Sequence, residues 1–167
     1  MILITAPTAL ATPVGAARVD VETAAQMAEA VGEALPQADA LIMAAAVADF
    51  RPRRASKSKI RRKAGVPDVT LEPTEDILAG LGATRPKVVV GFAAESEEVE
   101  ANARAKLKEK GLDLIVANNI TAPDAGFGSD TNRVTLISGN DAAEPLPLMT
   151  KANVAEAVLD RVVGLLS

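Results

Sequence analysis

Cationic side chains are gathered in one short segment of this 167-residue chain. Residues 51–63, RPRRASKSKIRRK, contain eight Lys or Arg residues and no acidic residue, whereas the whole chain has a net charge of −4. Mobile Lys and Arg side chains can close over a triphosphate and neutralise the charge that develops on a leaving pyrophosphate. A solvated charged loop is the alternative, and the acidic remainder of the chain argues against a nucleic-acid surface. We therefore interpret the segment as an anion-handling loop.

Three further segments carry residues that could contact a ligand. MAAAVADF (43–50) ends a predicted buried strand in small residues and then presents Asp49. In open α/β sheets ligands bind at the carboxyl ends of strands, where an Asp can hold a ribose hydroxyl or a metal; the alternative is an Asp that caps a helix or solvates a loop. Phe92 could stack on a nucleobase or fill the core. Lys106 and Lys110, four residues apart, share one face of a predicted helix, which could equally be a solvated face.

The composition excludes several kinds of protein. Cysteine and histidine are absent, which excludes disulfides, thiol nucleophiles, Ser-His-Asp triads and zinc sites built on these residues. A carboxylate-bound Mg²⁺ stays open, with unknown ligands. Three aromatic residues are too few for a base-stacking platform, so we expect no nucleic-acid partner. We expect no membrane span and no signal peptide, and the lack of cysteine fits the cytoplasm.

Elements of two kinds alternate along the chain and must position these residues. Short apolar segments at 2–5, 40–47, 87–94 and 112–118 predict buried strands of a parallel sheet. Helical patterns occur at 24–35, 75–83, 96–110 and 152–166, the first three preceded or opened by the candidate N-caps Thr23, Thr74 and Ser96. The alternation predicts an α/β fold, with a doubly wound (Rossmann-like), mostly parallel sheet in a single domain over 1–167.

The later part of the chain differs from this pattern. RVTLIS (133–138) and EPLPLM (144–149) flank the turn pair Gly139-Asn140, which predicts an antiparallel hairpin appended to the parallel sheet. Residues 49–66 are polar and lack periodicity, which favours a long mobile loop. The Gly/Asn/Asp-rich stretch 117–132 could line a polar pocket or could be ordinary turn chemistry.

Seven motifs follow one another along the chain: AAAVADF, SKIRRK, PTEDIL, VGFAAES, KLKEKGLDLIVAN, GFGSDTN and LPLMTK. Their combination resembles the phosphopantothenate–cysteine ligase family over essentially the whole chain. In many bacteria this ligase is the C-terminal domain of a bifunctional flavoprotein whose other half is a flavin-dependent decarboxylase. The family begins with a βα unit and a Ser-Ser-Gly-Lys loop that have no counterpart here, so the chain is expected to be truncated relative to the family.

The resemblance implies a reaction and its participants. CTP, with Mg²⁺, activates the carboxylate of 4′-phosphopantothenate as an acyl cytidylate, and the amine of cysteine then displaces CMP. Lys59 is implied as the catalytic residue, on the loop that closes over the triphosphate. Nucleotide and substrate contacts are implied at Met43, Ala44, Ala45, Asp49, Lys59, Glu75, Asp76, Ile77, Leu78, Phe92, Lys106 and Lys110.

A homodimer is also expected. In the family, subunits pair partly through the late hairpin, here 133–149, whose apolar residues would otherwise form an exposed face: Val134, Leu136, Leu146 and Leu148. The alternative is that the helix at 152–166 covers this face within one chain. Two other functions stay open: a non-catalytic nucleotide-binding or dimerisation fragment, and a nicotinamide-dependent Rossmann oxidoreductase, which the lack of a Gly-rich fingerprint disfavours.

Overall fold

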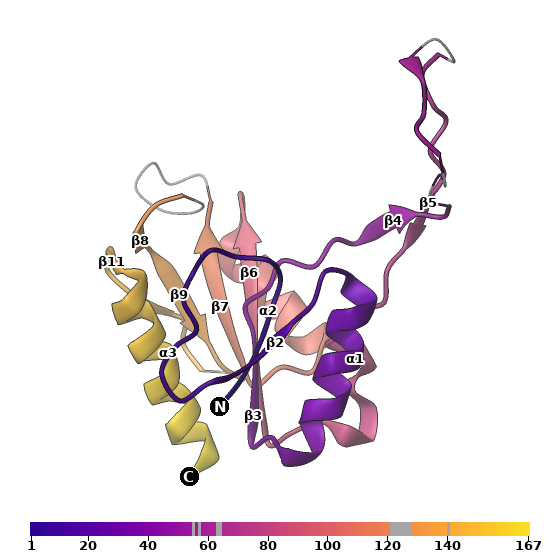
Figure 1. Ribbon diagram of the computed structural model, residues 1–167. Helices are drawn as coiled ribbons and strands as arrows, with labels where there is room; N and C mark the ends of the chain where they lie inside the picture. The colour runs from indigo at the N-terminus through magenta and orange to yellow at the C-terminus, as the bar shows by residue number, and fades with distance from the viewer. Residues whose placement is uncertain (55, 57, 63–64, 121–127, 140) are drawn as a thin grey trace. The chain divides into compact units, whose positions relative to one another are not determined.

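Figure 1 shows the computed structural model, which describes all residues except 55, 57, 63–64, 121–127 and 140. The chain divides into two compact units. The smaller unit comprises residues 1–33 and 46–80, and the larger comprises residues 34–45 and 81–167. Among the described residues, every helix is too short or too polar to cross a membrane.

A five-stranded sheet with the order β10-β9-β7-β6-β3 forms the centre of the larger unit. The strands β3 (Ala40–Met43), β6 (Val88–Glu95) and β7 (Leu114–Asn119) run parallel to one another. β9 (Val134–Ile137) pairs antiparallel with β7, and β10 (Glu144–Pro145) pairs antiparallel with β9. The predicted mostly parallel sheet with an appended antiparallel hairpin is therefore confirmed.

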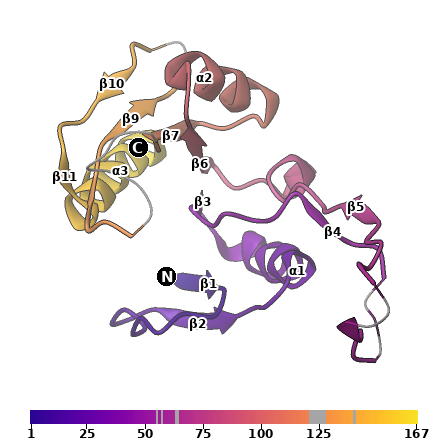
Figure 2. The same ribbon diagram turned by 90° about the horizontal axis from the view of Figure 1, so that it is seen from above.

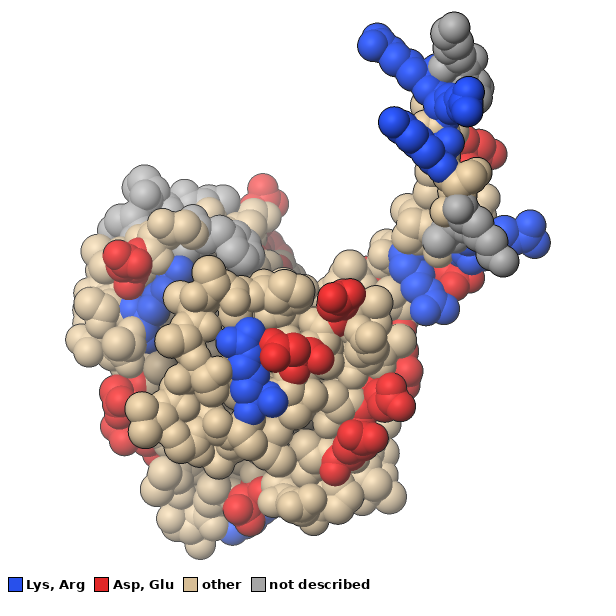
Figure 3. Space-filling view, viewed as in Figure 1, with Lys and Arg blue, Asp and Glu red and all other residues tan. Residues whose placement is uncertain are grey.

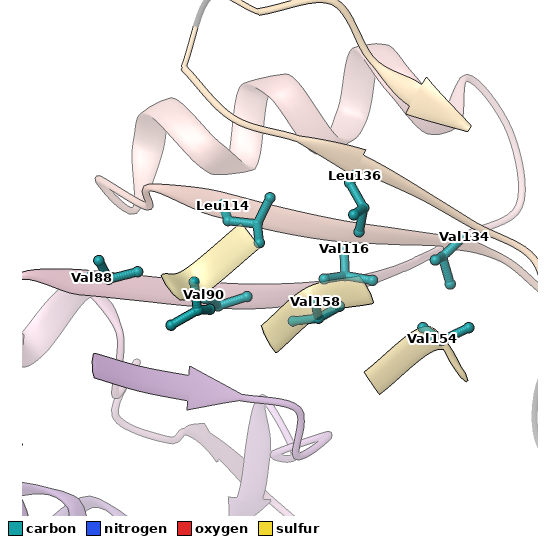
Figure 4. Close-up of a cluster of buried hydrophobic side chains, with 9 residues drawn as sticks. Val88, Val90, Leu114, Val116, Val134, Leu136, Val154 and Val158 are labelled. Carbon is teal, nitrogen blue, oxygen red and sulfur yellow. The ribbon is translucent and has the colours of Figure 1, made fainter. Parts of the chain in front are cut away.

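Helices cover both faces of this sheet, as a doubly wound fold requires. Because side chains alternate along a strand, the even-numbered residues of β6, β7 and β9 face α3 (Lys151–Leu166), which begins at the N-cap Thr150. The buried cluster on that face is shown in Figure 4 and consists of Val88, Val90, Leu114, Val116, Val134, Leu136, Val154, Val158 and Val162. The opposite face carries Val89 and Ile115, buried on the side of α2 (Val99–Glu109).

The apolar residues of the hairpin are mostly covered within the chain. Val134 and Leu136 are 2% and 3% exposed in the cluster with α3, and Leu146 packs against the same cluster. The prediction that this face is open to a second subunit is therefore wrong for these three residues, whereas Leu148 is 39% exposed. Gly139 has a φ of 48° at the turn, and its predicted partner Asn140 lies outside the described residues.

Short elements complete the larger unit. β8 (Thr131–Asn132) pairs antiparallel with β11 (Met149–Thr150), immediately before α3. The 3-10 helix η1 (Leu35–Gln37) leads into β3. β3 ends at Met43 rather than at the predicted residue 47, so the alanines that follow it have no strand partner.

Two predicted helix starts are wrong. α2 begins at Val99 after Glu98, which has a φ of 45°, and no side chain caps it; Ser96 lies outside the helix. The segment 75–83 forms no α-helix, and the 3-10 segment η3 (Ala79–Thr84) is broken at Gly82, where φ is 51° and ψ is −134°. The glycines in this stretch weaken a helix, and Gly82 adopts a conformation that other residues rarely reach.

The smaller unit begins with β1 (Ile2–Thr5), which lies beside β2 (Ala17–Asp20) in a two-stranded parallel sheet (Figure 2). The expectation of a buried first strand is wrong, because every residue of β1 is half-buried or exposed. α1 (Ala24–Ala34) begins where predicted: the Oγ1 of Thr23 accepts from the N–H of Gln26 at 3.1 Å, and the Oε1 of Gln26 accepts from the N–H of Thr23 at 3.0 Å. This reciprocal pair is a capping box.

The basic segment is partly structured. β4 (Phe50–Pro52) pairs antiparallel with β5 (Leu71–Pro73) to form a ribbon. The Nε of Arg51 lies 2.9 Å from the Oε1 of Glu72, and Arg53 lies 3.7 Å from the other carboxylate oxygen. The prediction of an irregular loop from residue 49 onward is therefore wrong at its start, because Glu72 offsets like-charge repulsion there and the strands pair.

Candidate active site

The carboxyl ends of β3 and β6 bring two predicted contact segments together in the larger unit. Met43, the last residue of β3, is the register partner of Gly91 in β6, and Phe92 follows directly. Ala44 and Ala45 continue from Met43 beyond the strand. Phe92 is 41% exposed, so it is not a core residue as the alternative interpretation held. This is the sheet edge at which α/β proteins bind ligands.

Lys106 reaches this edge from α2. Its Nζ lies 2.6 Å from the Oε1 of Glu95, the last residue of β6. Glu95 is an odd-numbered residue of β6, like Val89, and side chains alternate along a strand. Its side chain therefore points to the α2 side of the sheet. The Lys106 side chain is 45% exposed, whereas that of Glu95 is 12% exposed. The ammonium group therefore stands beside the strand end and is open to solvent.

Lys110 lies in a different place from Lys106. It is the C-cap of α2, and its N–H donates to the carbonyl of Lys106. α2 connects the carboxyl end of β6 to the amino end of β7, so it runs antiparallel to both strands. Lys110 is thus about 6 Å further from the carboxyl edge than Lys106 along the helix axis. The four-residue spacing therefore does not bring both residues equally close to the edge.

In the smaller unit, Thr74 joins Asp49 to the segment 75–78. The N–H of Thr74 donates to the carbonyl of Asp49 at 2.9 Å, and its hydroxyl donates to the carbonyl of Ala48 at 2.5 Å. Thr74 is therefore not the predicted helix cap. The side chains of Asp49, Glu75 and Asp76 are exposed beside this junction.

The segment 75–78 turns the chain without forming a helix. The Oδ1 of Asp76 accepts from the N–H of Ala79 at 3.2 Å, and the N–H of Gly80 donates to the carbonyl of Asp76 at 2.9 Å. Ile77 is 7% exposed, so its side chain is buried and any ligand contact falls to its backbone. Leu78 is half-buried. A backbone cradle is therefore the role that this turn can offer.

Lys59 is an exposed cation on the segment between β4 and β5. No ion pair engages it among the described residues, in contrast to Arg51 and Arg53. Figure 3 shows Lys and Arg side chains gathered on the β4–β5 ribbon and on the segment 53–70 that joins its two strands. Lys57 and Lys63 lie outside the described residues, as do residues 121–127 of the predicted polar loop.

Two residues at the carboxyl edge were not predicted from the sequence. Glu95 forms an ion pair with Lys106. Asn118 lies near the end of β7, and its buried Oδ1 has no hydrogen-bond partner in the described part of the chain. Asn118 is the register partner of Ala94 and shares the α3-facing side of the sheet with Phe92. The available signal was a polar residue at the end of each apolar strand, which marks the ligand-binding edge of a parallel sheet.

Comparisons with known proteins show the family to which the chain belongs. Residues 1–166 match the family model described as "DNA/pantothenate metabolism flavoprotein C-terminal domain". The chain belongs to this family. A solved structure of the C-terminal domain of coenzyme A biosynthesis bifunctional protein CoaBC shares 36% sequence identity and a TM-score of 0.78, over 96% of this chain and 71% of that chain.

The relatives of this domain are longer proteins than this chain. The CoaBC of Bacillus subtilis (strain 168) is 41% identical over 167 residues, which cover 99% of this chain and 41% of the relative. The CoaBC of Escherichia coli (strain K12) is 39% identical over 166 residues, with 96% and 41% covered. A relative from an unknown prokaryotic organism, named cysteine/cysteine sulfinic acid decarboxylase, is 44% identical over 149 residues, with 88% and 42% covered. The chain thus spans about two fifths of the length of these relatives.

A more distant structure supports the fold alone. The Cab2 mutant H337A in complex with phosphopantothenate-cysteine is 17% identical, with a TM-score of 0.66 over 89% of this chain and 54% of that chain.

Proposed function

We propose that the chain carries the phosphopantothenate–cysteine ligase activity of coenzyme A biosynthesis, with CTP as the activating nucleotide. The observation that carries the proposal is the register of Met43 with Gly91, because it sets Met43–Ala45 and Phe92 at one ligand-binding edge. The CoaBC relatives, named for coenzyme A biosynthesis, support the same pathway. The solvent-open lysine beside that edge suits a phosphate-bearing ligand.

The reaction has two steps. A carboxylate oxygen of 4′-phosphopantothenate attacks the α-phosphorus of CTP, the bond to the pyrophosphate breaks, and an acyl cytidylate forms. The amine nitrogen of cysteine then attacks the acyl carbon, CMP leaves with the former carboxylate oxygen, and the nitrogen loses a proton. Both steps depend on positioning and on neutralisation of phosphate charge rather than on a titrating base. A chain without His or Cys can therefore perform them.

Each predicted contact has a proposed role that fits its surroundings. Met43–Ala45 and Phe92 bind the nucleotide at the edge of the sheet, and the exposed ammonium of Lys106 binds its phosphates, with a further contact from Lys110 just beyond the end of α2. In the smaller unit, Asp49 binds through its carboxylate and the segment Glu75–Leu78 through its backbone. Lys59 is the catalytic residue in this proposal, because it is exposed and no ion pair among the described residues engages it, so it is available to the leaving pyrophosphate.

We propose Mg²⁺ as a companion of the nucleotide. The described residues contain no group of three His, Cys, Asp or Glu side chains that could hold a metal ion. Protein-bound Mg²⁺ commonly uses one or two carboxylates together with substrate phosphates. Asp49 is the carboxylate that we propose for this role, and the metal would supply charge neutralisation on the triphosphate.

A pyrophosphate-release assay on the chain tests the proposal. We expect release with CTP and 4′-phosphopantothenate alone, as a single turnover, and continuous release after cysteine is added. CTP should be preferred to ATP, and NADH should not bind. Binding of CTP without pyrophosphate release would favour the non-catalytic fragment, and binding of NADH in preference to CTP would favour the oxidoreductase.

We also propose that the chain forms a homodimer in the cytoplasm and works beside a flavin-dependent decarboxylase domain. The β4–β5 ribbon and the segment 53–70 that joins its strands are a better candidate for the dimer interface than the hairpin, because they expose apolar side chains. These are Phe50, Ile60, Val66, Val69 and Leu71. Sedimentation should give a dimer that Leu71→Lys weakens. Leu10→Lys, at a leucine outside the ribbon that is even more exposed than Leu71, should leave the dimer unchanged, and a wild-type monomer would contradict the proposal.

A further inference from the structure

We propose that Glu95 is a positioning residue that aims the ammonium group of Lys106 at the phosphates of the nucleotide. The inference rests on the proposed function, because it assumes that Lys106 binds phosphate. Nothing in the sequence resemblance gives Glu95 a role. The simple expectation is the opposite, since a carboxylate beside a phosphate site repels the ligand.

The geometry around Glu95 is that of a fixed anchor. Its side chain is 12% exposed at the end of β6, and its Oε1 lies 2.6 Å from the Nζ of Lys106. Its second oxygen, Oε2, accepts from the Nδ2 of Asn102 at 3.4 Å, and this amide also donates to the carbonyl of Glu97 at 3.0 Å. The carbonyl of Glu95 accepts from the N–H of Ile120 at 3.1 Å. Strand pairing and Ile120 thus hold the backbone of Glu95, and Asn102 holds its carboxylate.

The anchored lysine keeps capacity for a ligand. An ammonium group has three N–H donors, and Glu95 takes one of them. The Lys106 side chain is still 45% exposed, so the other donors face solvent at the sheet edge. A lysine otherwise loses considerable rotamer freedom when it binds a ligand. Glu95 restricts that freedom before the nucleotide arrives, which is preorganisation.

The same helix supplies a matched control. The Nη2 of Arg104 lies 3.0 Å from the Oε1 of Glu100, one turn earlier on α2. Glu100 is 58% exposed in its side chain, and the pair spans one helical turn on the surface. Glu100→Ala therefore removes the same charge and also breaks an ion pair, but it leaves Glu95 and Lys106 in place.

Calorimetric titration of the chain with CTP and Mg²⁺ tests the proposal. Preorganisation and simple charge repulsion predict opposite changes in CTP affinity when Glu95 is replaced. Lys106→Met should weaken CTP binding about 10-fold, and Glu95→Ala should weaken it about 5-fold although it removes a negative charge. The double variant should bind no more weakly than Lys106→Met, because Glu95 acts through Lys106. Glu100→Ala should change the affinity less than 2-fold, and circular dichroism should show that each variant is folded.

The contradicting results are distinct from a failure of the proposed function. Tighter CTP binding by Glu95→Ala would show that Glu95 merely repels the phosphates or competes for Lys106. Additive losses in the double variant would show that Glu95 acts by another route. Either result overturns the role of Glu95 while CTP still binds. A wild-type chain that binds CTP but releases no pyrophosphate would instead overturn the ligase proposal, and one that binds no CTP would overturn both.

Discussion

Thr74 forms a backbone hydrogen bond with Asp49, which lies twenty-five residues earlier in the sequence: the N–H of Thr74 donates to the carbonyl of Asp49 at 2.9 Å. The hydroxyl of Thr74 adds a second bond to the neighbouring carbonyl of Ala48. One threonine thus fixes the strand-end aspartate beside the turn that begins at Glu75. The two segments that resemble nucleotide contacts in the smaller unit are consequently a single structural feature.

Replacing Thr74 with valine should weaken CTP binding about 5-fold. The change keeps the shape of the side chain and the backbone bond but removes the hydroxyl, which leaves the Ala48 carbonyl without that donor and loosens Asp49; a hydrogen bond of this kind is worth about 1 kcal/mol. Calorimetry measures the change. Thr70→Val, at an exposed position in the same unit, is the control, and equal effects of the two substitutions would contradict the role of Thr74.

Lys59→Gln should slow acyl cytidylate formation about 100-fold and change CTP affinity less than about 3-fold, because charge neutralisation at the leaving pyrophosphate matters most in the transition state. Single-turnover pyrophosphate release and calorimetry measure the two quantities. Arg51→Gln should have little effect on either, since Arg51 is engaged by Glu72 at 2.9 Å. An equal loss of rate and affinity in Lys59→Gln would show that Lys59 contributes uniform binding alone.

Leu136→Ala should lower the free energy of unfolding by about 3 kcal/mol, because Leu136 is 3% exposed in the cluster beneath α3 and its truncation leaves a cavity. Leu159→Ala, on α3 but 46% exposed, should cost less than about 1 kcal/mol. Urea denaturation measures both. Similar small effects would mean that the hairpin is not covered by α3 and would restore it as a subunit surface.

Asn118→Val should raise the free energy of unfolding without nucleotide by about 1 kcal/mol. The substitution removes a buried carbonyl oxygen that has no partner among the described residues, and valine suits a strand facing an apolar helix. Asn132→Val should not stabilise the protein, because the Oδ1 of Asn132 accepts from the N–H of Arg133 at 2.9 Å. A less stable Asn118→Val variant would show that this oxygen is satisfied in solution.

Local patterns were sufficient to predict part of the fold. The apolar runs near 40, 88 and 114 became the parallel strands, because such runs are buried on both sides. Thr23 has the residue type of an N-cap and marked the start of α1 correctly, and the structure adds the reciprocal hydrogen bond with Gln26. The hairpin was also predicted, since its strands and turn are close in sequence.

The wrong predictions have two causes. Some depend on contacts between residues distant in sequence, and others on a backbone conformation that the residue types do not reveal. β4 and β5 pair across the basic segment, and nothing near Arg51 indicates that Glu72 will offset its charge. The three apolar residues of β1 could not show that the strand pairs with β2 in a sheet of its own. Ser96 has the right residue type for an N-cap, but α2 begins later, after a left-handed Glu98.

The site was predicted in its residues more completely than in its geometry. The motifs indicated Met43, Phe92 and Lys106, and the strand register places the first two together. Glu95 stands in the motif VGFAAES, but the motif gave it no role, because its contact with Lys106 depends on which face of β6 it occupies and on the helix packed there. Lys110 shows the converse: its spacing from Lys106 is helical, yet the helix has ended at the preceding residue.

The central claim is that the carboxylate of 4′-phosphopantothenate is activated by transfer of CMP. Incubation of the chain with CTP, cysteine and 4′-phosphopantothenate labelled with ¹⁸O at both carboxylate oxygens, followed by mass spectrometry of the nucleotide product, tests it most directly. We expect one ¹⁸O atom in each CMP released, with phosphopantothenoylcysteine formed in equal amount. Unlabelled CMP, or the label in free phosphate with CDP as the product, would contradict the acyl cytidylate and with it the function proposed for this chain.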